Sequence, residues 1–90
     1  PLADKWRSLG WCVYEVNGHD VVQIAEALDK ADDETQRPVA LIANTVKGKG
    51  VSFAENVAGF HNGALTPEQY QTATTELNAV IDELKLEIGI

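Results

Sequence analysis

The stretch Val39-Ala40-Leu41-Ile42-Ala43 decides the fold, because it is continuously apolar and follows Pro38. A run of this kind is typical of a strand that is covered on both faces, and a proline is tolerated where a strand opens. Upstream, the β-branched and aromatic residues from Trp11 to Val16 predict a second strand. The interval from Asn17 to Arg37 is long enough for a helical crossover and wrong for a hairpin. The strands are therefore predicted to be parallel, with a right-handed connection.

Helical patterns surround these strands. Apolar residues within 2–9 recur at helical spacing, and Gly10 stops that segment. Between the strands, Asp20 can cap a helix, and Gln23 three residues later completes a capping-box pattern. This crossover helix carries one apolar stripe, and a polar run is expected to end it and form a loop. The stripe comprises Val21, Ile24, Ala25, Leu28 and Ala31, and the polar run is residues 32–37.

A last helix is predicted to begin at a second capping box. Thr66 is the expected N-cap, Pro67 takes the first helical position, and Gln69 completes the box. The apolar face of this helix comprises Tyr70, Ala73, Leu77, Val80, Ile81 and Leu84. Its acidic residues are expected to form the solvated face, and they are Glu68, Glu76, Asp82, Glu83 and Glu87.

The predicted fold class is α/β, a βαβ unit with parallel strands and flanking helices. A parallel sheet needs both faces covered and is rarely two strands wide, so both edges of this sheet are left unpaired. Either a third strand lies in Gly50-Val51-Ser52-Phe53, or the sheet continues in polypeptide outside this chain. We favour continuation outside the chain.

Composition excludes several classes of function. The 90 residues allow one domain, and the net charge of −7 disfavours contact with nucleic acid phosphates. No apolar run approaches the ~20 residues that span a bilayer. The start at Pro1 is unlike a signal peptide and lacks an initiator Met, which we interpret as a cut or processed piece. Cys12 has no partner for an internal disulfide, and we expect a buried, inert thiol in a reducing, cytoplasmic setting.

A glycine-rich segment from Val46 to Leu65 holds four of the seven glycines of the chain. Long irregular segments are uncommon in compact domains and are often functional. In Lys47-Gly48-Lys49-Gly50, the glycines would let the backbone approach an anion and the lysines would neutralise it. Neither the Walker pattern nor the dinucleotide fingerprint fits, because Ala43 and Phe53 stand where those patterns need glycine. From these residues alone, a phosphate site and a solvated turn both remain open.

Both histidines of the chain lie on segments that leave the carboxyl ends of the predicted strands, where open α/β sheets bind ligands. His61 could donate a hydrogen bond to phosphate or relay a proton near neutral pH, and an exposed loop histidine is the alternative. His19 precedes the cap residue Asp20 and could simply bond locally. No ligand spacing such as His-x-x-x-His predicts a metal site.

Several of these segments resemble one known family in their order and spacing. They are Thr45-Val46-Lys47-Gly48-Lys49-Gly50-Val51-Ser52-Phe53, Glu55-Asn56 and Phe60-His61, with Trp6, Gly10-Trp11 and Asn17-Gly18-His19-Asp20 upstream. The resemblance is to the transketolase family, closest to the N-terminal subunits of split bacterial transketolases. It implies that residues 1–90 form a single domain, the C-terminal portion of a diphosphate-binding domain within a larger thiamine-diphosphate-binding fold.

The resemblance implies thiamine diphosphate and a divalent metal, Mg²⁺ or Ca²⁺, as cofactors of the parent protein. The family moves a two-carbon ketol unit from a ketose phosphate to an aldose phosphate, in the pentose phosphate pathway. The family loop that matches Lys47 and Gly48 lies along the cofactor, and the histidine that matches His61 reaches the diphosphate and the sugar. By this resemblance, Lys47, Gly48 and His61 are the predicted cofactor-binding residues, and His61 is the predicted catalytic residue.

The chain also departs from the family pattern. Asn17 replaces a usual Asp, Asn62 a common Gly, and Phe60 a frequent Trp. The Gly-Asp-Gly…Asn motif that holds metal and diphosphate is absent from the chain. The glutamate that activates the aminopyrimidine belongs to a different domain in the family. The expected partners are therefore the remainder of the diphosphate-binding domain and a pyrimidine-binding domain or subunit, and the isolated piece is expected to bind no cofactor and to be inactive.

Two other functions stay open at this point. Deoxyxylulose-phosphate synthase has a similar Lys-Gly-Lys-Gly loop, and a fragment of it is the nearest alternative. A non-catalytic assembly module is the second, because unpaired sheet edges could pair between copies. The fragment could also self-associate through surfaces that its missing neighbours cover. Neither nucleic acid nor a membrane is an expected partner.

Overall fold

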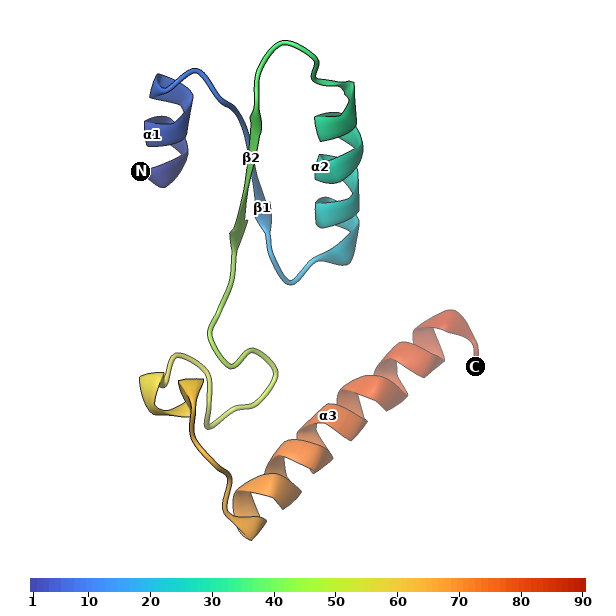
Figure 1. Ribbon diagram of the computed structural model, residues 1–90. Coiled ribbons are helices and arrows are strands. Elements are labelled where there is room, and N and C mark those ends of the chain that lie inside the picture. Colours follow the sequence, from blue (N-terminus) through green and yellow to red (C-terminus); the bar gives the residue numbers. More distant parts are fainter. The chain divides into compact units, whose positions relative to one another are not determined.

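Two parallel strands, β1 (Cys12–Asn17) and β2 (Val39–Asn44), form the sheet of the computed structural model, which describes residues 1–90 (Figure 1). The register pairs Cys12 with Val39 and Asn17 with Asn44. The α/β fold and the parallel pairing are therefore confirmed. Strand β1 begins one residue later than predicted, because the Trp11 N–H donates to the Trp6 carbonyl at 3.3 Å instead of joining the sheet.

The chain divides into two units, residues 1–45 and residues 46–90. The first unit contains the sheet with α1 (Leu2–Ser8) and α2 (Val21–Asp33). The second contains the glycine-rich segment, the 3₁₀-helix η1 (Ala58–His61) and α3 (Pro67–Ile88). That residues 1–90 form a single domain stays a prediction.

Helices α1 and α2 lie on opposite faces of the sheet (Figure 1), as the apolar sequence of β2 predicts for a strand covered on both sides. The buried side of α2 is narrower than its predicted stripe. Ala27 is buried, and Ile24 and Ala31 are half-buried, whereas Val21 and Leu28 are 78% and 52% exposed. Two strands give α2 too little sheet surface to cover the whole stripe.

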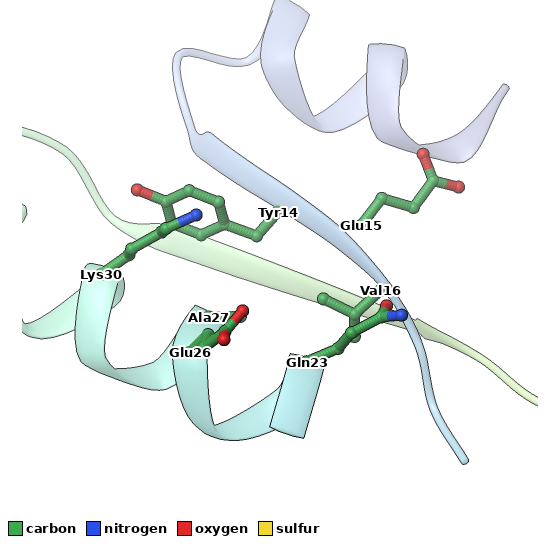
Figure 2. Close-up of a pocket in the computed structure, with 7 residues that line it drawn as sticks. All are labelled: Tyr14, Glu15, Val16, Gln23, Glu26, Ala27 and Lys30. Atoms are coloured by element: carbon green, nitrogen blue, oxygen red, sulfur yellow. The ribbon is translucent and has the colours of Figure 1, made fainter. Parts of the chain in front are cut away.

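A small cavity of about 140 Å³ lies between α2 and β1 (Figure 2). Tyr14 and Val16 extend from β1 toward α2, and Lys30 of α2 also lines the cavity. A hydrogen bond with the Cys12 side chain raises the pKa of Tyr14. The Cys12 thiol is buried, as predicted. No residue singled out for chemistry lines this cavity, so it is a feature of the helix–sheet packing.

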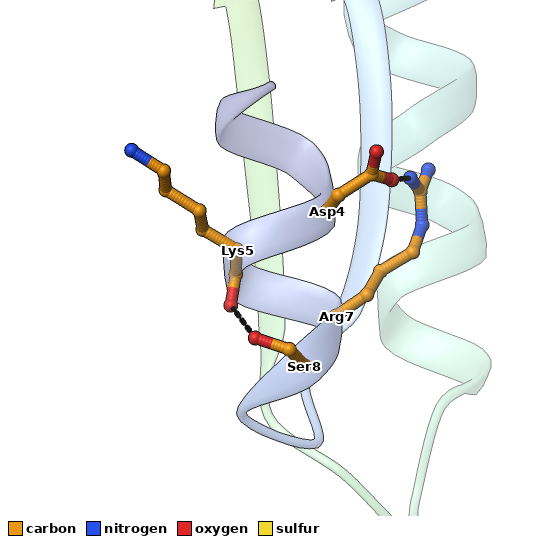
Figure 3. Close-up of polar contacts among 4 residues, drawn as sticks. All are labelled: Asp4, Lys5, Arg7 and Ser8. Carbon is orange, nitrogen blue, oxygen red and sulfur yellow. Dashed lines mark hydrogen bonds and ion pairs between the residues drawn. The ribbon is translucent and has the colours of Figure 1, made fainter.

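Helix α1 is short and is held by local contacts (Figure 3). The Arg7 guanidinium forms an ion pair with Asp4 at 2.9 Å, and the Ser8 hydroxyl donates to the Lys5 carbonyl at 2.7 Å. The rings of Trp6 and Trp11 meet edge to face with centroids 4.7 Å apart. This aromatic pair joins the helix to the residue that precedes β1.

Helix α2 starts at the predicted cap, although the capping box is only half formed. The Asp20 carboxylate accepts hydrogen bonds from the backbone N–H groups of Val22 and Gln23. The Gln23 side chain does not return to the Asp20 N–H. It accepts from the Asn17 N–H at 2.9 Å and donates to Asp20 Oδ2, so it fastens the end of β1 to the cap.

Replacing Asp20 by alanine is expected to destabilise the full-length protein by about 1 kcal/mol, because two N–H groups of the first turn lose their acceptor. The measurement is urea denaturation of the variant beside Asp29→Ala, which removes an exposed carboxylate from the body of the same helix. Equal stability of the two variants would contradict the capping role.

The end of α2 differs from the prediction. Asp32 and Asp33 belong to the helix, and the loop begins only at Glu34. Glu34 is the C-cap, its N–H donates to the Ala31 carbonyl, and its carboxylate pairs with Arg37 at 2.9 Å. The ion pair spans the turn, so the polar run supplies both the last turn of helix and the connection to β2.

Helix α3 begins with the complete capping box that the sequence predicts. The Thr66 hydroxyl accepts from the Gln69 N–H at 3.1 Å, and the Gln69 side chain accepts from the Thr66 N–H at 2.9 Å. The alternative third strand at residues 50–53 is wrong, because those residues form turns. The observed sheet has two strands, and its continuation outside the chain stays a prediction.

The buried residues of both units are all small. They are Ala3, Cys12, Ala27, Ala54 and Ala73. Within the unit of residues 46–90, the predicted apolar face of α3 is largely uncovered, since Leu77, Ile81 and Leu84 are 44%, 45% and 51% exposed. None of the helices combines the length and the apolar character that crossing a membrane requires.

Candidate functional site

The glycine-rich segment closes on itself at the positions that the sequence singles out. The Asn56 N–H donates to the Lys47 carbonyl at 2.8 Å, which brings the two ends of residues 47–56 together. Asn56 has a φ of 60°, a left-handed conformation that asparagine tolerates better than most residues. Within this loop, the Glu55 carboxylate accepts from the Gly50 N–H at 3.1 Å. The loop is therefore an ordered turn structure with a carboxylate at its centre.

Gly48 is required by this closure. Its φ is 75°, and a Cβ atom added there would lie 2.6 Å from the Ala54 carbonyl carbon. Ala54 is the buried residue of the loop. The closest approach of two backbone segments thus occurs at Gly48, and any side chain at that position would separate them.

The backbone N–H groups after Gly48 already have acceptors within the chain. Lys49 donates to the Val46 carbonyl, Gly50 to Glu55, and Val51 to the Gly48 carbonyl. The N–H groups of residues 49–51 are therefore not free to bind a phosphate in the predicted cradle. Positive charge for an anion comes instead from the exposed side chains of Lys47 and Lys49.

His61 ends η1, and Phe60 attaches this short helix to the loop. The rings of Phe53 and Phe60 lie 5.5 Å apart between centroids at an angle of 58°. Both phenylalanines are half-buried, whereas His61 is exposed. The unit formed by residues 46–90 therefore contains all three predicted site residues, Lys47, Gly48 and His61, with the imidazole accessible to a ligand.

Glu76 of α3 corrects one sequence interpretation, because it is not simply part of the solvated face. Its carboxylate accepts two hydrogen bonds from Ser52, one from the backbone N–H at 2.8 Å and one from the hydroxyl. These bonds, the hydroxyl's first, lower the pKa of Glu76. No local sequence signal could have predicted this pair, because the two residues are 24 positions apart. Ser52 also lies outside the helix, so helical periodicity does not relate it to Glu76.

The lowered pKa gives a pH dependence with a definite sign. The folded-state pKa of Glu76 lies below its ordinary value of 4.5, so its stabilising contribution is complete above that value and is lost as the pH falls through the lower pKa. We expect the Glu76 carboxyl carbon of the full-length protein to titrate below pH 4.5 in NMR. Ser52→Ala should move this titration toward the ordinary value, and an unmoved titration would contradict the assigned cause.

The loop that follows β1 belongs to the first unit and has its own local structure. The Asn17 side chain accepts from the backbone N–H of His19 at 2.9 Å, and the role of the His19 imidazole stays a prediction. Gly18 donates its N–H to the Asn44 carbonyl at 2.8 Å, so the ends of β1 and β2 are tied together. The juxtaposition of His19 with His61 stays a prediction.

The donor set of residues 47–61 fits a diphosphate group. Two exposed ammonium groups and an exposed imidazole are cationic or hydrogen-bonding partners for phosphate oxygens. The structure contains no group of three or more His, Cys, Asp or Glu residues that could hold a metal ion. Lys47, Gly48 and His61 could therefore contact the anionic end of a cofactor, and no metal ligand is assigned in this chain.

A family model described as the thiamine diphosphate binding domain of transketolase matches residues 1–83. The 6-deoxy-6-sulfo-D-fructose transketolase subunit SqwG of Clostridium sp. (strain MSTE9) is 42% identical over 77 residues, which are 86% of this chain and 28% of that protein. An apulose-4-phosphate transketolase subunit of Phocaeicola vulgatus is 38% identical over 86 residues, 96% of this chain and 31% of that protein. Transketolase-like protein 2 of Bos taurus is 33% identical over 66 residues, 73% of this chain and 10% of that protein.

The matched span includes the first unit, the second unit as far as residue 83, and every residue of the candidate site. The chain spans about three tenths of the length of the two bacterial relatives. The similarity therefore concerns one part of each of these relatives.

Proposed function

We propose that the parent protein transfers a two-carbon ketol unit from a ketose phosphate to an aldose phosphate. The reason is that the chain belongs to the thiamine diphosphate binding domain family of transketolases. The observation that carries the proposal is the closed loop of residues 47–56, which orders Lys47 and Gly48 within a matched span that also contains His61. The names of the relatives support transketolase over deoxyxylulose-phosphate synthase.

Each site residue has a role that its geometry supports. The Lys47 ammonium would neutralise phosphate charge, and Gly48 leaves the backbone free of a side chain at the closest part of the loop. The exposed His61 imidazole would hold a phosphate oxygen or move a proton at the reacting sugar. Thiamine diphosphate, when bound, supplies the carbanion and the electron sink that ketol transfer needs.

The rest of the machinery would come from outside this chain. The two bacterial relatives are named as subunits, and the chain covers 28% and 31% of their lengths. We assign the Mg²⁺ or Ca²⁺ ligands to the remainder of the diphosphate-binding domain. We assign the group that activates the aminopyrimidine to a pyrimidine-binding partner subunit or domain.

The test combines the full-length subunit with its partner subunit, thiamine diphosphate and Mg²⁺. We expect turnover of a ketose phosphate with an aldose phosphate, measured by formation of the new ketose. Because one relative is named for a sulfo-sugar and another for a sugar phosphate, donors with a terminal sulfonate and with a terminal phosphate should be compared. Turnover of neither donor would overturn the proposal.

The 90-residue chain alone should be inactive in the same assay, because it would lack the metal ligands and the pyrimidine-binding partner. Turnover by this piece would contradict that division of roles. Consumption of pyruvate with release of carbon dioxide by the assembled protein would favour the synthase alternative instead. Stable association of the piece without any catalytic contribution to the assembled enzyme would favour an assembly module.

A further inference from the structure

Glu76 joins the site segment to a rigid element. Its two carboxylate oxygens accept separately from the backbone N–H and the hydroxyl of Ser52, so the contact fixes both the position and the orientation of that residue. One helical position further, Leu77 Cδ2 lies 3.6 Å from the position that a Cβ on Gly50 would take. Helix α3 therefore binds the loop at Ser52 and also lies near Gly50.

From Ser52, the path continues toward His61 through one ring contact and the backbone. Ser52 is followed by Phe53, whose ring packs against Phe60. Phe60 donates its N–H to the Val57 carbonyl at 3.1 Å within the first turn of η1, and His61 is the next residue. Each step is a direct bond, a ring contact or an adjacent peptide unit, so the path from Glu76 to His61 is continuous.

A second path leads from the same loop toward the lysine. Gly50 is bonded to Glu55, and Asn56 closes the loop onto the Lys47 carbonyl. The carboxylates of Glu55 and Glu76 thus accept hydrogen bonds from the N–H groups of Gly50 and Ser52, respectively. The loop therefore holds the backbone of Lys47, while the phenylalanine pair joins it to the short helix that ends at His61.

We propose that Glu76 is a positioning residue of this site: through Ser52 it holds Phe53 against Phe60, and so sets His61 relative to Lys47 and Gly48. The inference rests on the proposed function for what the site binds. It goes beyond that function by assigning a role to a residue that contacts neither cofactor nor substrate. The loss of either half of the Glu76–Ser52 contact should then loosen the histidine and the loop together.

The test uses the full-length subunit assembled with its partner subunit. Four variants are compared with the wild type, namely Glu76→Gln, Ser52→Ala, Ser52→Thr and Glu83→Gln. Ser52→Thr keeps a hydroxyl, and Glu83→Gln removes an exposed carboxylate from the same helix. The measurements are amide hydrogen exchange over residues 50–61, calorimetric affinity for thiamine diphosphate with Mg²⁺, and kcat with KM for ketol transfer.

Glu76→Gln and Ser52→Ala should each speed exchange over residues 50–61 by about tenfold, because a charge-assisted bond is lost. Both should also weaken thiamine diphosphate binding and lower kcat. Ser52→Thr should restore most of each quantity, and Glu83→Gln should leave all of them unchanged. In a His61→Ala background, Glu76→Gln should lower kcat by less than about twofold, because the group that it positions is already gone.

Unchanged exchange in Glu76→Gln would overturn the proposal. So would faster exchange combined with unaltered cofactor affinity and kcat, or full additivity with His61→Ala, since either result means that the contact stabilises the loop without setting the histidine. A wild-type assembly that binds no thiamine diphosphate would instead overturn the proposed function, and with it the role of Glu76 toward that cofactor.

Discussion

Replacing His61 by alanine in the full-length, assembled protein is expected to lower ketol transfer by about two orders of magnitude or more, as for a group that acts in general acid–base catalysis. The imidazole is exposed at the end of η1, so its removal should not disturb the packing of the Phe53–Phe60 pair. The measurement is steady-state kcat and KM, with circular dichroism to show that the fold is retained.

A second substitution separates the two roles that the sequence leaves open for this histidine. In His61→Gln, the side-chain amide can still donate a hydrogen bond to a phosphate oxygen, whereas it cannot relay a proton. Activity well above that of His61→Ala would assign His61 to phosphate binding, and equal loss in both variants would assign it to proton transfer. Asn62→Ala, at the exposed neighbouring position, serves as the control. An unchanged rate in His61→Ala would remove the residue from the site.

Gly48→Ala is expected to open the loop and to abolish measurable binding of thiamine diphosphate at concentrations that saturate the wild type. A left-handed conformation costs an alanine about 1–2 kcal/mol. The added Cβ would also lie 2.6 Å from the Ala54 carbonyl carbon, and relieving such overpacking costs about 1–3 kcal/mol more. Both effects destabilise the ten-residue loop that the Asn56–Lys47 hydrogen bond closes. Only Ala54 of this loop is buried, so no large core compensates for the lost stability.

Two other glycines make matched controls for Gly48→Ala. Gly10 has a φ of 88° with no atom within 4 Å of an added Cβ, so Gly10→Ala should show the conformational cost alone. Gly59 has neither a positive φ nor a neighbour within 4 Å, so Gly59→Ala should be nearly neutral. The three variants are compared by thermal unfolding and by calorimetric titration with thiamine diphosphate. Equal behaviour of Gly48→Ala and Gly59→Ala would contradict the close approach at Gly48.

Periodicity predicted most of the secondary structure because its signals are local. The crossover interval from Asn17 to Arg37 required parallel strands, and Thr66 with Gln69 marked the start of α3 at the residue where the structure has it. The prediction failed where two local signals competed. Gln23 had the spacing of a capping box, but its side-chain oxygen accepts a hydrogen bond from the Asn17 N–H at the end of β1 instead of from the Asp20 N–H.

Candidate residues for the site could be predicted from the sequence, whereas the contacts that surround them could not. Lys47, Gly48 and His61 were predicted from residue types and resemblance and stay predictions, and the acceptors of the loop N–H groups were not foreseen. Glu76 falls in a run of acidic residues that resembles an ordinary solvated face, and only the folded chain brings it to Ser52. Contacts between residues so far apart produce no periodic pattern in the sequence, so only the structure reveals them.

The small side chains of the buried set have a calorimetric consequence. Heat capacity rises on unfolding in proportion to the apolar area that water newly reaches, and alanines together with one cysteine contribute little of it. Taken by itself, this stretch of 90 residues should give a shallow, broad endotherm and a weak response to urea. Sharp cooperative melting would then be a property that it acquires only when larger neighbours cover the leucines and isoleucines along α3.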